Sequence, residues 1–332
     1  MKKITISILI ITLGIIFLQI NSNIVTCQKT KGRIIYVDDD GNKDYTSIIE
    51  ALNNASDGDE IYVYSGTYTG YFFINKSISL IGENNENTNI CYLPNQSISK
   101  SLIVILADNV IISNFTIKNN LLPTIDKTDT LPPTWIYDYG IGIEVLSNNN
   151  ILSGNIIKNN SGYGILLNNS QNTKIYNNYL TQHTQSCIYL KNSSNNLIIN
   201  NTIINNERGI IFHIKSTNNT LYYNNFINNT YYHVYCESNN LFYNKNLEQG
   251  NYWDNYNGTD RNNNAIGDTP YQISGGNIQD PYPLMSPYVG RLTLKEYYVD
   301  PDALFNMLII GVVIAILVSI PIAYIWYKKT RL

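Results

Sequence analysis

The stretch between residues 148 and 238 repeats itself every 23 residues, and this period constrains the fold more than any other feature of the chain. The repeat divides into blocks 148–170, 171–193, 194–216 and 217–238, the last of which is one residue shorter. A fixed period of this length is typical of stacked supersecondary units. Each block is therefore one unit that buries its apolar side against its neighbours.

Equivalent positions of the blocks form three columns of similar residues. The columns are Asn155, Asn178, Asn201 and Asn224; Ile157, Leu180, Ile203 and Phe226; and Ile165, Ile188, Ile211 and Val234. Between them, short apolar or β-branched runs alternate with Asn, Ser or Gly, which predicts strands of about 3–5 residues and tight turns. The pattern predicts an all-β fold, a single-stranded right-handed parallel β-helix, with coils stacked about 4.8 Å apart.

The asparagine column has two interpretations. Asn tolerates left-handed backbone conformations at turns, and stacked Asn side chains can form hydrogen-bonded ladders. Turn chemistry is the simpler explanation, and a role in ligand binding is the alternative.

The composition argues against a nucleic-acid partner. Only 14% of the 332 residues are charged and the net charge is −3, so the chain lacks the basic footprint that nucleic acid requires. The four cysteines, Cys27, Cys91, Cys187 and Cys236, show no CxxC spacing. Because Cys187 and Cys236 lie two coils apart, we expect them to be buried and unpaired rather than bridged.

The two ends of the chain predict secretion and a membrane anchor. Residues 1–27 begin with Lys2 and Lys3 before an apolar run, which predicts a signal peptide, with an uncleaved anchor as the alternative. Near the C-terminus, Met307–Trp326 is 20 residues long and uncharged, and Lys328, Lys329 and Arg331 follow it. By the positive-inside rule the C-terminus is cytoplasmic and the upstream domain extracellular. The expected segments are a juxtamembrane linker at 291–303, a single-pass transmembrane α-helix at 304–327 and a tail at 328–332.

The β-helix itself is expected over residues 31–249, with an N-terminal cap helix. Thr46 or Ser47 can begin this helix, and Ile48, Ile49, Leu52 and Ala55 would form its apolar side. A solenoid end exposes its core and unpaired backbone, so an amphipathic cap is needed there.

The run Tyr36-Val37-Asp38-Asp39-Asp40-Gly41, followed by Asp44-Tyr45-Thr46-Ser47-Ile48 and Gly66-Thr67-Tyr68, resembles the start of NosD-type β-helix proteins. These are carbohydrate-binding and sugar-hydrolase-like proteins, common on archaeal surfaces, and the segment more distantly resembles pectin methylesterases. Asp38–Asp40 could perform acid–base chemistry. Their position ahead of the coils, before a Gly turn, favours a role in the turn and cap.

Residues 250–290 contain a second resemblance. Gly250-Asn251-Tyr252-Trp253-Asp254 and the later G-D-x-P-Y and D-x-Y-P-L patterns are similar to the closing motif of the NosD-like family. We expect this segment to cap the last coil with Trp253 and Tyr252.

A loop within this cap has the spacing of a calcium site. Asp260, Asn262, Asn264 and Asp268 place oxygen side chains at positions one, three, five and nine, which suits Ca²⁺. Ala265 stands where the family loop usually has Gly, and Asn replaces Asp at two ligand positions. The site would carry about two negative charges, so a modest affinity is expected. The alternative is an Asx-turn loop held by its own hydrogen bonds.

An insertion enlarges one coil. Ile117 and Ile157 are equivalent in pattern but 40 residues apart, which places about 17 extra residues between Asn120 and Gly140. Loops inserted into solenoids often carry binding function. The candidate ligand-binding residues of the insertion are Trp135, Tyr137 and Tyr139, with Asp126, Asp129 and Asp138.

Copper is not expected, although the name of the family suggests it. His183, His213 and His233 fall at different offsets of their blocks, and the chain has only three methionines, so no Cu(I) cluster is predicted.

Three classes of function compete. The first is a cell-surface module that binds glycans or neighbouring surface proteins or is purely structural, the second a polysaccharide-active enzyme, and the third a NosD-like accessory protein in metalloenzyme maturation. Within 148–238 the acidic residues are only Glu207 and Glu237, so the regular coils lack the paired carboxyls of a hydrolase. The sequence favours binding or structure over catalysis.

Overall fold

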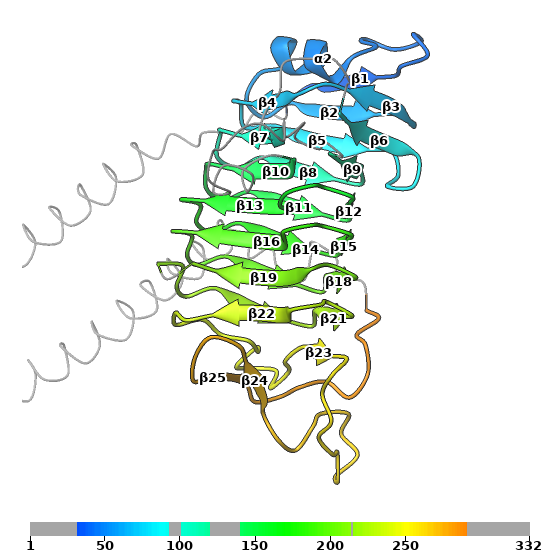
Figure 1. Ribbon diagram of the computed structural model, residues 1–332. Helices are drawn as coiled ribbons and strands as arrows, with labels where there is room; N and C mark the ends of the chain where they lie inside the picture. Colours follow the sequence, from blue (N-terminus) through cyan, green and yellow to red (C-terminus); the bar gives the residue numbers. More distant parts are fainter. Residues whose placement is uncertain (1–31, 93–100, 120–139, 214, 291–332) are drawn as a thin grey trace, which may run out of the picture. The chain divides into compact units, whose positions relative to one another are not determined.

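The computed structural model describes residues 32–92, 101–119, 140–213 and 215–290. These residues form a right-handed parallel β-helix of about eight turns, which confirms the predicted solenoid (Figure 1). Within them no helix is both long and apolar enough to cross a bilayer. The predicted signal peptide, linker, transmembrane helix and tail lie outside the described residues.

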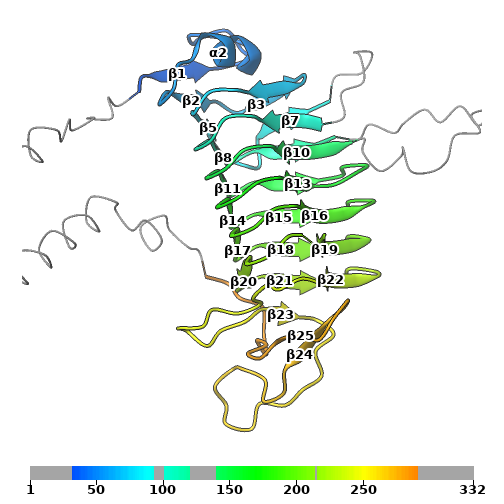
Figure 2. The same ribbon diagram turned by 90° about the vertical axis from the view of Figure 1, so that its left-hand side faces the viewer.

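Three parallel sheets run along the stack, and each regular coil visits them in the order A, B, C (Figures 1 and 2). Sheet A contains β1 (Ile34–Val37), β2 (Glu60–Val63), β5 (Ser79–Gly82), β8 (Ile111–Ser113), β11 (Ile151–Ser153), β14 (Lys174–Tyr176), β17 (Leu197–Ile199) and β20 (Thr220–Tyr222). Sheet B contains β3 (Gly66–Thr69), β6 (Thr88–Cys91), β9 (Thr116–Lys118), β12 (Ile156–Lys158), β15 (Tyr179–Thr181), β18 (Thr202–Ile204), β21 (Asn225–Ile227) and β23 (Tyr252–Trp253). Sheet C contains β4 (Phe72–Ile74), β7 (Ser101–Ile105), β10 (Ile141–Val145), β13 (Ile165–Asn168), β16 (Ser186–Lys191), β19 (Arg208–Phe212) and β22 (Tyr232–Cys236).

The strand register confirms two of the predicted columns and corrects the third. Ile157 is aligned with Leu180, as predicted, and with Ile117 on its other side, which confirms the separation of 40 residues. In sheet C, however, Ile188 is aligned with Ile210 and not with Ile211. The predicted place of Ile211 was wrong because the corner before β19 is one residue shorter than in the neighbouring coils. Ile211 is half-buried on the outer side of the sheet.

The corners explain why the chain is so rich in Asn-Asn pairs. The first Asn of each pair has a positive φ, the left-handed conformation that Asn tolerates, and the second is buried. The pairs are 149–150, 159–160, 177–178, 195–196, 200–201, 205–206, 218–219 and 228–229. One dipeptide thus turns the chain and supplies a side chain to the coil interior.

The buried Asn of each corner bonds to the next coil. At the corner between sheets A and B, the backbone amide of Asn155 donates to Oδ1 of Asn178 at 3.0 Å, and Asn178 donates likewise to Asn201. The side-chain amide of Asn201 donates to the carbonyl of Ile175 in the preceding coil at 2.9 Å. These contacts support the interpretation of the asparagine column as turn chemistry.

Helix α2 (Ile48–Asn54) packs against the N-terminal end of the core. The Ser47 hydroxyl accepts from the Ile49 amide at 3.2 Å and begins the helix, as predicted. Ile48, Ala51 and Leu52 are buried, whereas Ile49 is 37% exposed, so its predicted place on the apolar side was wrong.

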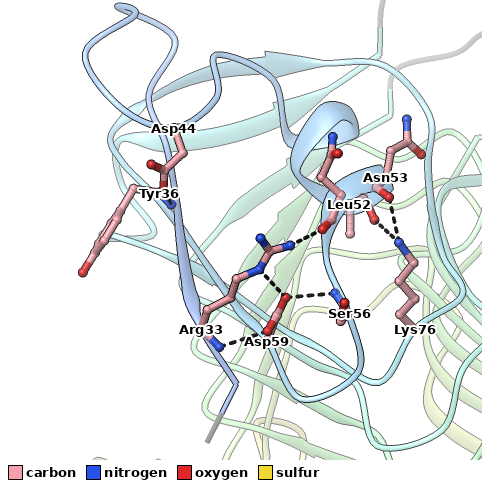
Figure 3. A network of polar contacts seen from close by, with 9 residues as sticks. Arg33, Tyr36, Asp44, Leu52, Asn53, Ser56, Asp59 and Lys76 are labelled. Atoms are coloured by element: carbon pink, nitrogen blue, oxygen red, sulfur yellow. Dashed lines mark hydrogen bonds and ion pairs between the residues drawn. The ribbon is translucent and has the colours of Figure 1, made fainter.

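Charged side chains hold the end of this helix (Figure 3). Lys76 donates to the carbonyls of Leu52 and Asn53 at 2.9 Å each. Arg33 donates to the Asn54 carbonyl and, through Nε, to buried Asp59 at 2.9 Å. Burial raises the pKa of Asp59, but the hydrogen bonds from Arg33 and Ser56 outweigh it and leave the pKa below its ordinary value.

Trp253 covers the C-terminal end of the core. Its ring is 1% exposed and stacks on Phe226 at 4.5 Å and on Tyr271 at 4.3 Å. Tyr271 belongs to an antiparallel hairpin of β24 (Tyr271–Ile273) and β25 (Ile278–Asp280). The capping role of Trp253 is confirmed. That of Tyr252 was wrong, because Tyr252 is only half-buried and pairs with Asn225 on the outer side of sheet B.

The hydrogen-bonded column of buried asparagines at the corner between sheets A and B ends at a carboxylate. Oδ2 of Asp280 accepts from the Asn251 amide at 2.8 Å and from Nε1 of Trp253 at 3.0 Å. Burial raises the pKa of Asp280 to about 6, and the hydrogen bonds offset this only in part.

Candidate ligand-binding face

The outer face of sheet C concentrates tyrosine in the regular coils. Side chains alternate along a strand, so the neighbours of the buried column that contains Ile188, Ile210 and Val234 point outward. The outward row, in register, is Phe73, Val104, Glu144, Leu166, Tyr189, Ile211 and Tyr235. The strands that carry this row lie one after another along the stack (Figures 1 and 2).

Two tyrosine pairs flank Ile211 on this face. Tyr163 stacks on Tyr189 with ring centroids 4.9 Å apart, and Tyr232 lies 5.4 Å from Tyr235. All four rings are half-buried, so their exposed sides are held in place by the sheet below. We call Tyr163, Tyr189, Tyr231, Tyr232, Tyr235 and Arg208 the tyrosine face.

Arg208 is fixed at one edge of the tyrosine face. Its guanidinium lies 5.0 Å from the ring centre of Tyr231, and Nη1 lies 3.5 Å from the Glu207 carboxylate. Tyr231 is 63% exposed. The arrangement presents fixed aromatic surface beside hydrogen-bonding groups, which is the chemistry that sugar rings need.

The described carboxylates of this face are too far apart for glycoside hydrolysis. Glu144 is 7% exposed, accepts a hydrogen bond from Ser101 at 2.6 Å, and lies four strands, or about 19 Å, from the strand that precedes Glu237. Glu207 and Glu237 lie near opposite ends of neighbouring strands, about 20 Å apart along the strand direction. Hydrolysis requires carboxyl groups about 5–9.5 Å apart.

The predicted residues of the insertion, Trp135, Tyr137, Tyr139, Asp126, Asp129 and Asp138, lie outside the described residues. In the sequence these residues lie between β9 of sheet B and β10 of sheet C. Sheet C carries the tyrosine face.

Sequence reasoning missed the tyrosine face. Tyr189 and Tyr235 each follow a residue of the buried column by one position, so an alternation of buried and exposed positions was the available signal. The misplaced third column obscured it, because it put Ile211 inside the coil.

The Asp38–Asp40 run forms a turn beneath the cap, as expected. Oδ1 of Asp38 accepts from the Asp40 amide at 3.2 Å, and Oδ2 of Asp39 accepts from the Thr67 amide at 2.9 Å. The Asp39 amide donates to the Tyr68 hydroxyl at 3.3 Å. These contacts tie the turn to strand β3.

In the predicted calcium loop the side-chain oxygens accept backbone amides. Asp260 accepts from Asn264 and Ala265 at 3.2 and 2.8 Å, and Asn262 also accepts from Asn264. Oδ2 of Asp268 accepts from the Arg261 amide at 2.9 Å. The four predicted ligands thus belong to one hydrogen-bonded loop, as the Asx-turn alternative requires, and calcium binding stays a prediction.

The histidines occupy three different environments. His183 takes the place of the buried Asn at the corner between sheets B and C, where its Nδ1 faces the Asn160 side-chain amide at 3.4 Å. Nε2 of His183 is buried without a hydrogen-bond partner. His213 is exposed, and Nε2 of His233 lies 2.8 Å from the Asp254 carboxylate.

The described cysteines are unpaired. Cys187 and Cys236 are buried and free, as predicted, and Cys91 is half-buried. Burial raises the pKa of the Cys187 thiol well above its ordinary value.

Comparison with known proteins gives a family and several distant folds. The family model described as "Periplasmic copper-binding protein (NosD)" matches residues 52–258. A search of curated proteins finds no match.

Among solved structures, pectate lyase Pel9A is 13% identical with a TM-score of 0.49, and the alignment covers 71% of this chain and 67% of the lyase. ORF18 of Geobacillus virus E2 is 18% identical with a TM-score of 0.44, covering 60% of this chain. The chain spans only 42% of that phage protein. Carrot pectin methylesterase is 12% identical with a TM-score of 0.36, over 56% of this chain and 62% of the enzyme.

Proposed function

The chain belongs to the NosD family, and from that premise we propose that it is a membrane-anchored extracellular β-helix that binds glycans on its tyrosine face. The observation that carries the proposal is the two tyrosine pairs of this face, one stacked with ring centroids 4.9 Å apart and one tilted with centroids 5.4 Å apart, which the β-helix holds in fixed register. Aromatic surface held by a scaffold contacts a ligand at little cost in conformational entropy.

The described residues do not fit the copper that the family description names. Among them no group of three or more His, Cys, Asp or Glu side chains could hold a metal ion. His183 lies in the hydrogen-bonded column at the corner between sheets B and C, and Nε2 of His233 contacts the Asp254 carboxylate. The raised pKa of Cys187 keeps its thiol protonated, whereas the thiolate is the metal ligand. The proposal therefore contains no copper-dependent step.

The location outside the cell is part of the proposal. It is supported by the charge pattern of the two terminal apolar segments, which leaves the β-helix on the extracellular side whether or not residues 1–27 are removed. Neighbouring surface proteins are the alternative partners, and a NosD-like accessory protein in metalloenzyme maturation is the alternative role.

We predict that an array of immobilised glycans will retain the purified full-length protein. Tyr189→Ala should lower the retained signal about tenfold, because it removes one ring of the stack at the centre of the face. Tyr179→Ala is the matched control, since Tyr179 is 42% exposed on sheet B, away from the tyrosine face. Trp135→Ala tests the predicted contribution of the insertion. If no immobilised glycan retains the protein, glycan binding is excluded and a purely structural or protein-binding role remains.

We predict no turnover of acidic polysaccharides. Because the described carboxylates of the face are about 19 Å or more apart, hydrolysis lacks its acid–base pair. Incubation with polygalacturonate should release no reducing ends and no unsaturated sugar, with an active pectate lyase as the positive control. Steady product release would instead favour the polysaccharide-active enzyme, with its site at the insertion.

We also propose that Asp260, Asn262, Asn264 and Asp268 bind Ca²⁺ with modest affinity. Millimolar calcium should raise the melting temperature of the protein, because a ligand that binds only the folded state stabilises it. Asp260→Ala combined with Asp268→Ala should abolish that rise, whereas magnesium should not reproduce it in the parent protein. If calcium leaves the melting temperature of the parent protein unchanged, the proposal that this loop binds Ca²⁺ is wrong.

A further inference from the structure

We infer that the ligand of the tyrosine face is a linear, uncharged glycan that lies along the stack of coils and covers at least three consecutive sugar units. The inference rests on the glycan-binding function proposed above and adds the class, length and direction of the ligand. Three features of the face carry it: the spacing of the tyrosine pairs, the side chain between them, and the balance of exposed charges.

The spacing sets the minimum length of the ligand. Tyr189 on β16 is aligned with Ile211 on β19, and Ile211 is aligned with Tyr235 on β22. At about 4.8 Å per coil, the two tyrosine pairs lie about 10 Å apart along the stack. One coil rise is comparable with one pyranose unit of an extended chain. A glycan that contacts both pairs therefore places its first and third units on them.

The residue between the pairs sets the direction. Ile211 is half-buried and apolar, so it fills the row between the rings without a polar group. A middle sugar unit can pass over it and keep its hydroxyl groups toward solvent or toward Arg208. The row follows the inter-coil register, so a chain that contacts both pairs runs along the stack rather than along a strand.

The exposed charges around the face balance. Glu207 lies 3.5 Å from Arg208, and Glu237 accepts a hydrogen bond from the Tyr235 hydroxyl. Lys191 is exposed two residues beyond Tyr189, on the same side of its strand. Arg208 and Lys191 are therefore matched by two carboxylates, and the exposed Lys215 lies beyond the end of β19, four residues after Ile211. An acidic polysaccharide gains no net attraction here, whereas neutral hydroxyl groups can donate to the carboxylates and accept from Arg208 and Lys191.

The experiment measures affinity against chain length. Full-length protein in detergent is titrated by calorimetry with neutral oligomers of glucose, xylose, mannose and N-acetylglucosamine, from one to six units, and with oligogalacturonates of the same lengths. For a neutral series we expect affinity to rise at least about tenfold between two and four units and then level off. The affinity should not change between low and high salt, and oligogalacturonates should bind no more tightly than neutral oligomers of the same length.

Two variants separate the inference from the proposed function. Tyr189→Ala and Tyr235→Ala should each remove the rise with length and leave the weak binding of one unit, whereas Tyr179→Ala should retain the rise. Binding that is independent of length, or that prefers oligogalacturonates, would overturn the inference and leave glycan binding in place. If no oligomer binds and no immobilised glycan retains the protein, the proposed function itself is wrong.

Discussion

Replacing Asn201 by Ala is expected to lower the free energy of unfolding by about 4 kcal/mol, through the buried backbone groups that lose their partners. The Asn201 side chain donates to the carbonyls of Ile175 and Ile199 and to Oδ1 of Asn224, at 2.9 to 3.0 Å. Its own Oδ1 accepts from the Asn178 amide at 3.0 Å. Alanine leaves the Asn178 amide without its acceptor and removes the side-chain donor of the Ile175 and Ile199 carbonyls, in a site that is 0% exposed.

The adjacent Asn200 supplies the matched control. It belongs to the same dipeptide but has a positive φ of 50°, and its side chain donates to Asn177 at 2.7 Å in a part-buried position. Asn200→Gly removes the same amide without left-handed strain, so we expect a change within about 1 kcal/mol. Urea unfolding followed by far-UV circular dichroism measures both variants. Equal losses of unfolding free energy for the two variants would refute the distinction between the turn position and the buried position of the Asn-Asn pair.

His183→Asn is expected to stabilise the protein and to reduce its sensitivity to acid. Burial lowers the pKa of His183 to about 3, an effect that backbone groups of Ile157 and Asn160 offset only in part. His183 stands where the corner ladder otherwise has Asn, between Asn160 and Asn206. Asparagine restores both a donor and an acceptor there, which should contribute about 1–2 kcal/mol at pH 7.

The pH dependence follows from the lowered pKa. The unfolded histidine binds a proton below about pH 6.5 and the folded one only near pH 3, so stability is lost as the pH falls between these values. The loss amounts to about 2 kcal/mol at pH 5 and about 4 kcal/mol at pH 3. Asp280, whose raised pKa is about 6, has the opposite sign, because its contribution is lost as the pH rises from about 4 to about 6.

The comparison of parent and variant isolates His183, since both proteins contain Asp280. The difference in their free energies of unfolding should be constant above pH 7 and should widen toward pH 4. Urea unfolding at several pH values measures it. A difference that does not change with pH would mean that the pKa of His183 is the same in the folded and the unfolded protein, and the assigned burial effect would be wrong.

Much of the fold followed from local pattern alone. The period of 23 residues, the alternation within strands and the Asn-rich corners predicted a parallel β-helix, and Ser47 was among the predicted helix starts. The coils near the N-terminus depart from the repeat, so the positions of strands β1, β3 and β6 did not follow from it. Trp253 was predicted to cap the last coil from the resemblance of its segment to the closing motif of the NosD-like family, and the structure shows that it continues the column of Phe226.

The candidate site was harder to predict, since it depends on register. A one-residue change in a corner moves a side chain from one side of the sheet to the other, which is why Ile211 was placed inside the coil. Alternation along the strand marks Tyr189 as outward, but no local pattern shows that its ring stacks on Tyr163 across neighbouring coils.

The sequence by itself therefore determined the stacked β-helix, because strand alternation and turn chemistry act over a few residues and repeat with each coil. Only the tertiary structure decided which side chains share the outer face of sheet C and which polar groups form hydrogen bonds between the corners of neighbouring coils. Those relations join residues about one coil apart, and they depend on the length of every corner between them.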